Sequence, residues 1–268
     1  MDRKKFLWFT DTHLNLAALG AKFDFYLKIE KEKPDGVFLT GDISNGSNTI
    51  NDLKYLARNV EVPIYFVLGN HDYFYNSIDG MNDKIRLLCK EYPNLIWMTE
   101  SNPIALNNEV AIIGTEGWYD AMVGDPKYIK YTFDWFMISN IRKLPSMKDR
   151  IEAFRKLADV SCNIIEKQLN KALDDGYKTI YMLTHFPPWV EATRDVGTIM
   201  EKFWLPYNTN LRLGKLIESI MKDRNKINLF ILCGHSHCPL SIRVTRNINC
   251  QVGKAHTHFK LNSQIIYA

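Results

Sequence analysis

The chain has 268 residues, of which 46% are hydrophobic and 24% are charged, and its formal net charge is +4. This is the composition of an ordinary globular protein, and it excludes a disordered chain, a collagen and a coiled-coil fibre. A net charge this small supplies no strong electrostatic field, so it does not favour a protein that coats DNA or an anionic membrane.

The chain also carries no clear targeting signal. No apolar run approaches the ~18 residues that a membrane-spanning helix needs. The apolar stretch 6–9 near the N-terminus is short, whereas a signal peptide needs roughly 7–15 apolar residues. The five cysteines form no Cys-x-x-Cys pair and are odd in number, which is not typical of a disulfide framework. We therefore expect a cytoplasmic protein in a reducing compartment, without a membrane span.

Short apolar runs recur along the chain, and each is followed by polar residues. Their length and their β-branched and aromatic content favour buried strands. In chain order, the predicted strands are 6–9, 37–39, 64–68, 110–113, 179–183 and 229–232. Past residue 240 three shorter pieces predict a closing antiparallel segment, at 240–244, 248–252 and 258–261.

Apolar residues at helical spacing lie between these runs. They predict helices over 50–60, 85–89, 151–172 and 213–220, the third ending before Gly176, which suits the residue after a helix C-terminus. Alternating strands and helices predict an α/β fold whose strands are largely parallel and covered on both faces. Because no repeat or linker interrupts the pattern, we expect a single domain over 1–268.

Chemically active residues stand directly after the predicted strands. Five of the seven histidines do so, and they share these positions with Asp and Asn residues. The strand ends read Asp11-Thr12-His13, Gly41-Asp42, Gly69-Asn70-His71-Asp72, Thr184-His185 and Gly234-His235-Ser236-His237. In open α/β sheets, ligands bind at the carboxyl ends of the strands. The sequence therefore predicts that these side chains meet at one edge.

A metal site explains this gathering better than turn formation does. A single Asp or His at a strand end is usually a turn former, but so many unpaired polar groups would cost several kcal/mol each in desolvation. Imidazole and carboxylate ligands without cysteine suit Mn, Fe, Zn, Co or Ni better than Mg or Ca. The candidates exceed what one open site can use, which favours two ions roughly 3.5–4 Å apart, bridged by one carboxylate.

These five blocks, in this order and context, resemble the calcineurin-like metallophosphoesterase superfamily. The resemblance implies a four-layer α-β-β-α sandwich, with two mixed sheets flanked by helices and a dinuclear metal site at the C-terminal ends of the strands. It implies that the first ion is held by Asp11, His13 and His237, that the second is held by Asn70, His185 and His235, and that Asp42 bridges them.

The resemblance also implies a mechanism and cofactors. A metal-bridging hydroxide would attack phosphorus in line, and His71 would stabilise or protonate the departing oxygen. The cofactors would be two divalent or trivalent transition-metal ions, with Mn or Fe favoured. The expected function is hydrolysis of a small phosphodiester or phosphomonoester. The alternatives are a nuclease of the DNA-repair type, for which the chain lacks a strong nucleic-acid-binding signature, and a non-catalytic scaffold with the same fold.

One block departs from the protein Ser/Thr phosphatases of this superfamily. Those enzymes carry G-D-x-V-D-R-G, whereas this chain has Asn45 in place of the second Asp and lacks the arginine. Asp72 stands where that group typically has Glu. These differences disfavour activity on phosphoproteins and indicate a member of the bacterial and phage type, whose substrates include phosphodiesters, nucleotides and lipid-linked phosphates.

Several further residues are open to two interpretations. The segment 115–148 is predicted to form a lid or cap, in which Trp118 and Tyr119 either stack on a nucleobase or, as we favour, pack their loop onto the helical insertion after it. A structural zinc site at 233–238 is disfavoured because Cys233 lies where a strand buries its side chains. Arg194 and Arg212 are candidates for binding a phosphate group, but we expect both at the surface. His256 and His258 are candidates for contacting the metals, but we expect them on an edge strand.

Overall fold

The computed structural model describes residues 3–193, 203–255 and 262–268, and within them two β-sheets face each other. The first sheet has the strand order β11-β1-β2-β3-β4. Neighbours from β1 to β4 pair in parallel, and β11 pairs antiparallel with β1. The strands are β1 (Lys5–Phe9), β2 (Gly36–Thr40), β3 (Ile64–Val67), β4 (Leu95–Trp97) and β11 (Gln264–Tyr267).

The second sheet has the order β5-β6-β7-β8-β10-β9. The four central strands are parallel, and β5 and β9 are antiparallel strands at the two edges. Its strands are β5 (Ile104–Ala105), β6 (Val110–Gly114), β7 (Thr179–Leu183), β8 (Asn228–Cys233), β9 (Leu240–Arg243) and β10 (Ile248–Val252). Both sheets are therefore mixed.

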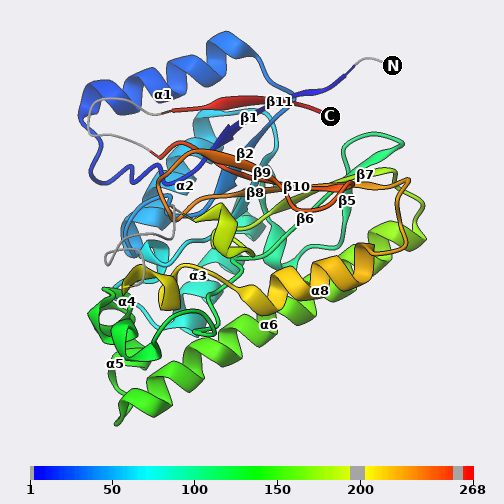
Figure 1. Cartoon of the computed structure of the whole chain (residues 1–268). Helices are drawn as coiled ribbons and strands as arrows, with labels where there is room; N and C mark the ends of the chain where they lie inside the picture. The colour runs from blue at the N-terminus through cyan, green and yellow to red at the C-terminus, as the bar shows by residue number, and fades with distance from the viewer. Residues whose placement is uncertain (1–2, 194–202, 256–261) are drawn as a thin grey trace.

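Helices cover the outer face of each sheet (Figure 1). The first sheet packs against α1 (Leu19–Glu32), α2 (Ser47–Asn59) and α3 (Ile78–Glu91) in one apolar core. The second packs against α6 (Met147–Asp174) and α8 (Leu211–Met221), which lie side by side on the opposite side of the molecule from α1. The predicted four-layer α-β-β-α sandwich is confirmed.

The alternation of side chains along β1 shows how one strand serves two cores. Leu7 and Phe9 belong to the core beneath the helices, whereas Phe6 and Trp8 belong to the core between the sheets. Successive side chains of a strand point to opposite faces, and here both faces are covered. From Phe6 to Phe9 this strand is therefore apolar, as is typical of parallel strands buried on both sides.

Short helical segments make up much of the remaining chain. They are η1 (His71–Tyr73), η2 (Met98–Glu100), η3 (Pro126–Tyr131), α4 (Asp134–Met137), α5 (Ser139–Arg142), η4 (Val190–Ala192) and η5 (Leu205–Tyr207). Three of them, η3, α4 and α5, lie in the segment 115–148. Among the described residues, no helix is both long enough and apolar enough to cross a membrane.

The predicted strands and helices are present, with one correction. The segments 240–244 and 248–252 pair antiparallel with each other, as predicted, but 248–252 (β10) also runs parallel to β8 and lies between β8 and β9. The chain reverses through β9 at the sheet edge, so the next strand regains the direction of β8. The piece 258–261 lies outside the described residues, and the pattern analysis did not predict α1, β4, β5 or β11.

We predict that Phe38→Ala lowers the free energy of unfolding by about 3–5 kcal/mol, the usual cost of removing a buried aromatic ring. Phe38 is fully buried between the sheets, and its ring stacks on Phe6 with centroids 4.6 Å apart. Urea denaturation followed by circular dichroism measures the change. The control is Phe23→Ala on α1, where the side chain is 66% exposed and little change is expected. Equal effects of the two substitutions would contradict this account of the core.

Candidate metal centre

The loops that follow β1, β2, β3, β7 and β8 bring the predicted site residues together at the carboxyl edges of the two sheets. Asp11 follows β1, Asp42 follows β2, Asn70 follows β3, His185 follows β7, and His235 follows β8. Parallel strands end at the same edge of a sheet, so residues far apart in sequence become neighbours. All seven predicted ligands and His71 lie in this region.

The backbone is strained where several of these residues lie. Positive φ angles occur at eight non-glycine positions of the described chain, and five of these belong to the site: Asp11 (47°), His13 (38°), Asp42 (47°), His235 (66°) and His237 (56°). A positive φ is unfavourable for residues with a side chain, and such strain concentrates at functional sites. The sharp turns let side chains two residues apart, such as Asp11 and His13, approach the same point.

Two glycines permit the close approach of these loops. A Cβ atom on Gly41, whose φ is +85°, would lie 2.5 Å from Nδ1 of His185. A Cβ atom on Gly69 would collide with Oδ1 of Asp42 and would lie 2.8 Å from Cε1 of His185. The glycines in the Gly-Asp and Gly-Asn-His blocks are therefore required because the ligands themselves occupy the adjacent space.

Asp72 joins the loops after β2 and β3. Its buried carboxylate accepts hydrogen bonds from the backbone N–H groups of Ser44 (3.0 Å), Gly69 (2.8 Å) and Ile43 (3.3 Å), and from Oγ1 of Thr49 (2.7 Å). Burial and the nearby Asp42 carboxylate raise the pKa of Asp72 to about 6, although these hydrogen bonds oppose the rise. Asp72 therefore holds the two loops together. Among the described residues, the side chains that could hold a metal ion form two clusters, and Asp72 belongs to neither.

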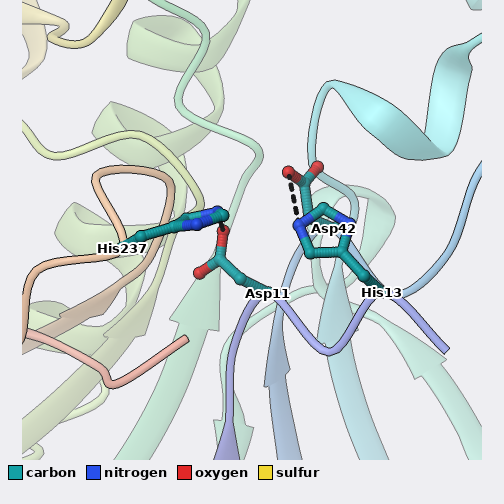
Figure 2. A group of neighbouring side chains, drawn as sticks. All are labelled: Asp11, His13, Asp42 and His237. Atoms are coloured by element: carbon teal, nitrogen blue, oxygen red, sulfur yellow. Dashed lines mark ion pairs between the residues drawn. The ribbon is translucent and has the colours of Figure 1, made fainter. Parts of the chain in front are cut away.

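The first cluster of ligand atoms comes from Asp11, His13, Asp42 and His237 (Figure 2). One atom from each lies within 4.8 Å of the others. Nε2 of His237 is 3.2 Å from Oδ1 of Asp11, and Nε2 of His13 is 3.8 Å from Oδ2 of Asp42. Nδ1 of His13 is buried without a hydrogen-bond partner. The carboxylates of Asp11 and Asp42 thus face two imidazoles across a gap that suits a cation.

The second cluster comprises Asp42, His185 and His235. Nε2 of His185 lies 3.5 Å from Oδ1 of Asp42, 3.1 Å from Oδ1 of Asn70 and 3.3 Å from Nδ1 of His235. Asn70 therefore adds an amide oxygen to this cluster. Asp42 belongs to both clusters, one oxygen facing each, which is the position expected of a bridging ligand.

Backbone carbonyls determine which nitrogen each ring presents in the second cluster. Nδ1 of His185 is 2.9 Å from the carbonyl oxygen of Thr40, and Nε2 of His235 is 3.1 Å from that of Tyr207. A carbonyl only accepts, so these nitrogens carry hydrogen and the opposite nitrogens present lone pairs in the neutral rings. When both rings are neutral, the lone pairs of Nε2 of His185 and Nδ1 of His235 and the oxygen Oδ1 of Asn70 point toward one another, with no hydrogen-bond donor among these three atoms. This arrangement fits a bound cation.

The pKa values show that the histidines of the site differ in charge. Burial lowers the pKa of His13 to about 4 and that of His235 to about 3, so both rings are neutral and able to bind metal at pH 7. Burial opposes ionisation of Asp11, yet the hydrogen bond and charge of His237 hold its pKa below the usual range. The same contact raises the pKa of His237 to about 9 against the effect of burial. A proton on His237 thus provides the positive charge that Asp11 requires.

His71 lies beside both clusters but belongs to neither. Its backbone N–H donates to Oδ1 of Asp42 (2.9 Å), and its Nε2 is 3.9 Å from Oδ2 of the same residue. Its Nδ1 is 3.1 Å from Oδ1 of Asn45, and its ring stacks on Phe74 with centroids 4.4 Å apart. The side chain is 29% exposed, whereas that of Asp42 is 2% exposed. His71 therefore borders the site from the solvent side.

The structure adds a residue that the sequence analysis missed. Asp134, in α4, accepts a hydrogen bond from Nδ2 of Asn70 (2.7 Å) and another from the hydroxyl of Tyr119 (3.1 Å). Burial raises the pKa of Asp134, and the hydrogen bond from Asn70 opposes this rise. No local signal identifies an isolated Asp in an irregular segment as part of a site, because its partner lies 64 positions away.

Other candidates from the sequence lie elsewhere. Trp118 and Tyr119 are buried and pack against Phe154 and Phe186, so they pack the loop and do not offer a face to a nucleobase. The Arg212 guanidinium pairs with Asp159. Neither ligand cluster of the described chain contains a cysteine, and Cys233 is fully buried in β8. Three candidates lie outside the described residues: Arg194, His256 and His258.

Two mixed sheets lie between helices and carry a buried His/Asp cluster at the strand ends. Residues 4–239 match the family model of the calcineurin-like phosphoesterases. The chain therefore belongs to this family. The resemblance inferred from the sequence blocks is confirmed.

The chain is similar in sequence to a viral protein and similar in fold to several solved structures. An uncharacterised protein of Acanthamoeba polyphaga mimivirus is 28% identical in an alignment of 182 residues. The alignment covers 64% of this chain and 61% of the viral protein, so the chain spans less than two thirds of that protein's length. A phosphopantetheinyl hydrolase from Mycobacterium tuberculosis has a similar fold, with a TM-score of 0.64, 15% identity and coverage of 94% of this chain and 90% of that one. A dimetal phosphatase from Danio rerio also has a similar fold, with a TM-score of 0.58 and 13% identity. The match covers 95% of this chain and 88% of that one.

We predict that Asp42→Asn reduces the bound metal from two ions per chain to fewer than one. The substitution removes the negative charge that both clusters share. Elemental analysis after loading with Mn²⁺ and gel filtration measures the stoichiometry. The matched control is Asp24→Asn on the exposed surface of α1, which should bind as the wild type does. Two retained ions in the Asp42→Asn variant would exclude Asp42 as the shared ligand.

Proposed function

We propose that the protein is a dinuclear metal-dependent hydrolase of small phosphodiesters or phosphomonoesters. The observation that carries this proposal is the position of Asp42, whose two oxygens face two separate groups of ligand atoms. A single mononuclear site would leave one of these groups without a cation, and the desolvation of its polar groups would remain uncompensated. Family membership supports the reaction class, and the donor set supports transition metals over Mg or Ca.

In this proposal, the ligands divide between two positions. Asp11, His13 and His237 would hold one ion, and a second set of ligands would hold the other, with Asp42 shared: Asn70, His185 and His235. When bound, such ions neutralise charge on phosphoryl oxygens and lower the pKa of water enough to supply a nucleophile at neutral pH. Mn or Fe would suit both positions.

The chain's own contribution to the reaction is positioning and proton transfer. His71 would donate a proton, or a hydrogen bond, from Nε2 to the oxygen of the leaving group. The contact between its Nδ1 and Asn45 fixes the ring so that Nε2 faces the site. Asn45 thus occupies the place of the Asp that orients this histidine in the protein phosphatases, and it does so without a negative charge.

The two alternative functions find less support. A non-catalytic scaffold would have no reason to keep both ligand clusters together with His71 beside them. For a nuclease, clustered Lys and Arg at the site would be expected, and Arg212 is instead paired with Asp159. We propose a single domain over 1–268 in which the insertion 115–148 covers the side of the second position through Asp134.

The substrate class can be tested with chromogenic esters. We expect Mn²⁺-dependent turnover of bis(p-nitrophenyl) phosphate, of p-nitrophenyl phosphate, or of both, well above an Asp42→Asn blank. A preference for the diester would identify a phosphodiesterase, and a preference for the monoester would identify a phosphatase. Turnover equal to the blank on both esters, in protein that contains two ions, would favour the scaffold. Cleavage of DNA but of neither ester would favour the nuclease.

We predict that His71→Ala lowers kcat by about 10²–10⁴-fold, the usual contribution of a positioned general acid. The loss should be greater for an alkyl ester than for a p-nitrophenyl ester, because p-nitrophenolate departs without protonation. Metal content should stay at two ions, since His71 contributes no ligand atom to either cluster. If the substitution instead strips the metal, His71 is a ligand and its assignment as an acid is wrong.

A further inference from the structure

We infer that Asp134 is a positioning residue that sets the affinity of the second ion position, by fixing which end of the Asn70 amide faces it. This inference rests on the proposed function, because it assigns a role within the same dinuclear centre. Its basis is a chain of hydrogen bonds that runs from the insertion 115–148 into the ligand cluster.

The amide of Asn70 lies between two different neighbours. Its Oδ1 is 3.1 Å from Nε2 of His185, and its Nδ2 donates to Oδ1 of Asp134 at 2.7 Å. Asn70 is 4% exposed and Asp134 is 1% exposed, so water does not compete for this contact. The other carboxylate oxygen of Asp134 accepts from the hydroxyl of Tyr119 at 3.1 Å. Asp134 therefore accepts two hydrogen bonds from buried donors.

The chemistry of an amide explains why such a partner is needed. The oxygen and nitrogen ends of Asn are nearly identical in shape, so packing alone does not choose between them. A cation requires the oxygen. An ionised carboxylate only accepts hydrogen bonds, so it binds the NH₂ end and rejects the oxygen end. With Asp134 in place, the flipped amide would face its oxygen toward a carboxylate and its NH₂ toward a cation, and both contacts would be unfavourable.

Asp134 is itself firmly held. It begins α4, where its N–H points at Oγ1 of Thr132 (3.4 Å), and the adjacent Trp135 is buried beneath the guanidinium of Arg150, 4.6 Å from its ring. The N–H of Tyr75 donates to the carbonyl of Met137 (2.8 Å). This bond ties the end of α4 to the chain just after Asn70. The segment thus holds the carboxylate at a fixed place relative to the amide.

His235, the other histidine of the second cluster, is oriented by a partner on the same side of the site as Asp134. Nε2 of His235 donates to the carbonyl oxygen of Tyr207 in η5, and η5 packs against η3 of the insertion. Rings of Tyr119 and Tyr207 lie 6.5 Å apart. Two ligands of the second position therefore depend on partners around the insertion, whereas the side chain of Asp11 bonds to Thr10, His235 and His237 instead. We expect disturbance of Asp134 to affect the two ions unequally.

The test is a Mn²⁺ titration by calorimetry, with bound metal confirmed by elemental analysis, for the wild type and three variants. In Asp134→Asn the side chain can donate as well as accept, so the Asn70 amide is free to flip. We expect one of the two Mn²⁺ affinities, that of the position served by Asn70, to fall about 10–100-fold, as is usual when the partner of a metal ligand is lost, and the other affinity to stay unchanged. Asn70→Asp alone should also weaken the second ion, because two carboxylates then face each other.

The double variant Asn70→Asp/Asp134→Asn restores the complementary pair with its polarity reversed. Asp at 70 offers an oxygen to the ion and another to the NH₂ of Asn at 134, so binding should recover to above that of either single variant. A merely structural role of Asp134 gives no reason for such rescue. The control is Phe133→Ala, next to Asp134 but 65% exposed, which should titrate as the wild type does.

The outcomes separate this inference from the proposed function. Wild-type binding of two ions, with unchanged second-ion affinity in Asp134→Asn, would overturn the inference alone. So would a double variant that binds no better than the single variants. A wild type that binds one ion or none would overturn the proposed function, and the inference with it. Retained binding of the first ion in each variant shows that the protein is folded.

Discussion

The burial of two carboxylates governs this structure. Asp11 and Asp42 are 0% and 1% exposed, and an ionised carboxylate in a protein interior costs several kcal/mol unless it is paired and hydrogen-bonded. Backbone N–H groups of His235 and His71 supply part of the compensation. The strained turns and the two glycines exist because these groups must approach within a few ångströms. His237, whose pKa is raised to about 9, supplies a positive charge beside Asp11, whereas His13 and His235 are neutral and could bind metal ions.

Much of the fold could be predicted because its strands are buried on both faces. β1 is apolar from Phe6 to Phe9, which distinguishes it from the amphipathic helices along the chain. The parts that were missed lack that signal. β5 has two residues, and α1 has a solvent-facing side where Leu19 and Phe23 are 88% and 66% exposed, which blurs its helical pattern. The parallel direction of β10 depends on where β9 joins the sheet, and no local pattern records that.

The ligand clusters could be anticipated because each block lies at the end of a strand, and topology brings parallel strand ends together. Geometry within the site could not be read in this way. The orientation of His185 and His235 is set by carbonyls of Thr40 and Tyr207, which any residue could provide. Asp134 contacts Asn70 from the insertion 115–148, whose sequence has no regular helix or strand pattern. The sequence favours packing of Trp118 and Tyr119, and the structure confirms it, because burying large aromatic rings against a neighbouring helix is more favourable than exposing them.

Electron paramagnetic resonance of the Mn²⁺-loaded protein tests most directly whether two ions share Asp42. Two Mn²⁺ ions roughly 3.5–4 Å apart with a common carboxylate are exchange-coupled. A bridged pair should give a broad, temperature-dependent signal with closely spaced hyperfine lines once two equivalents are bound. The simple hyperfine pattern of isolated Mn²⁺, persisting at full loading, would contradict a bridged pair. It would show that the two clusters do not act as one centre.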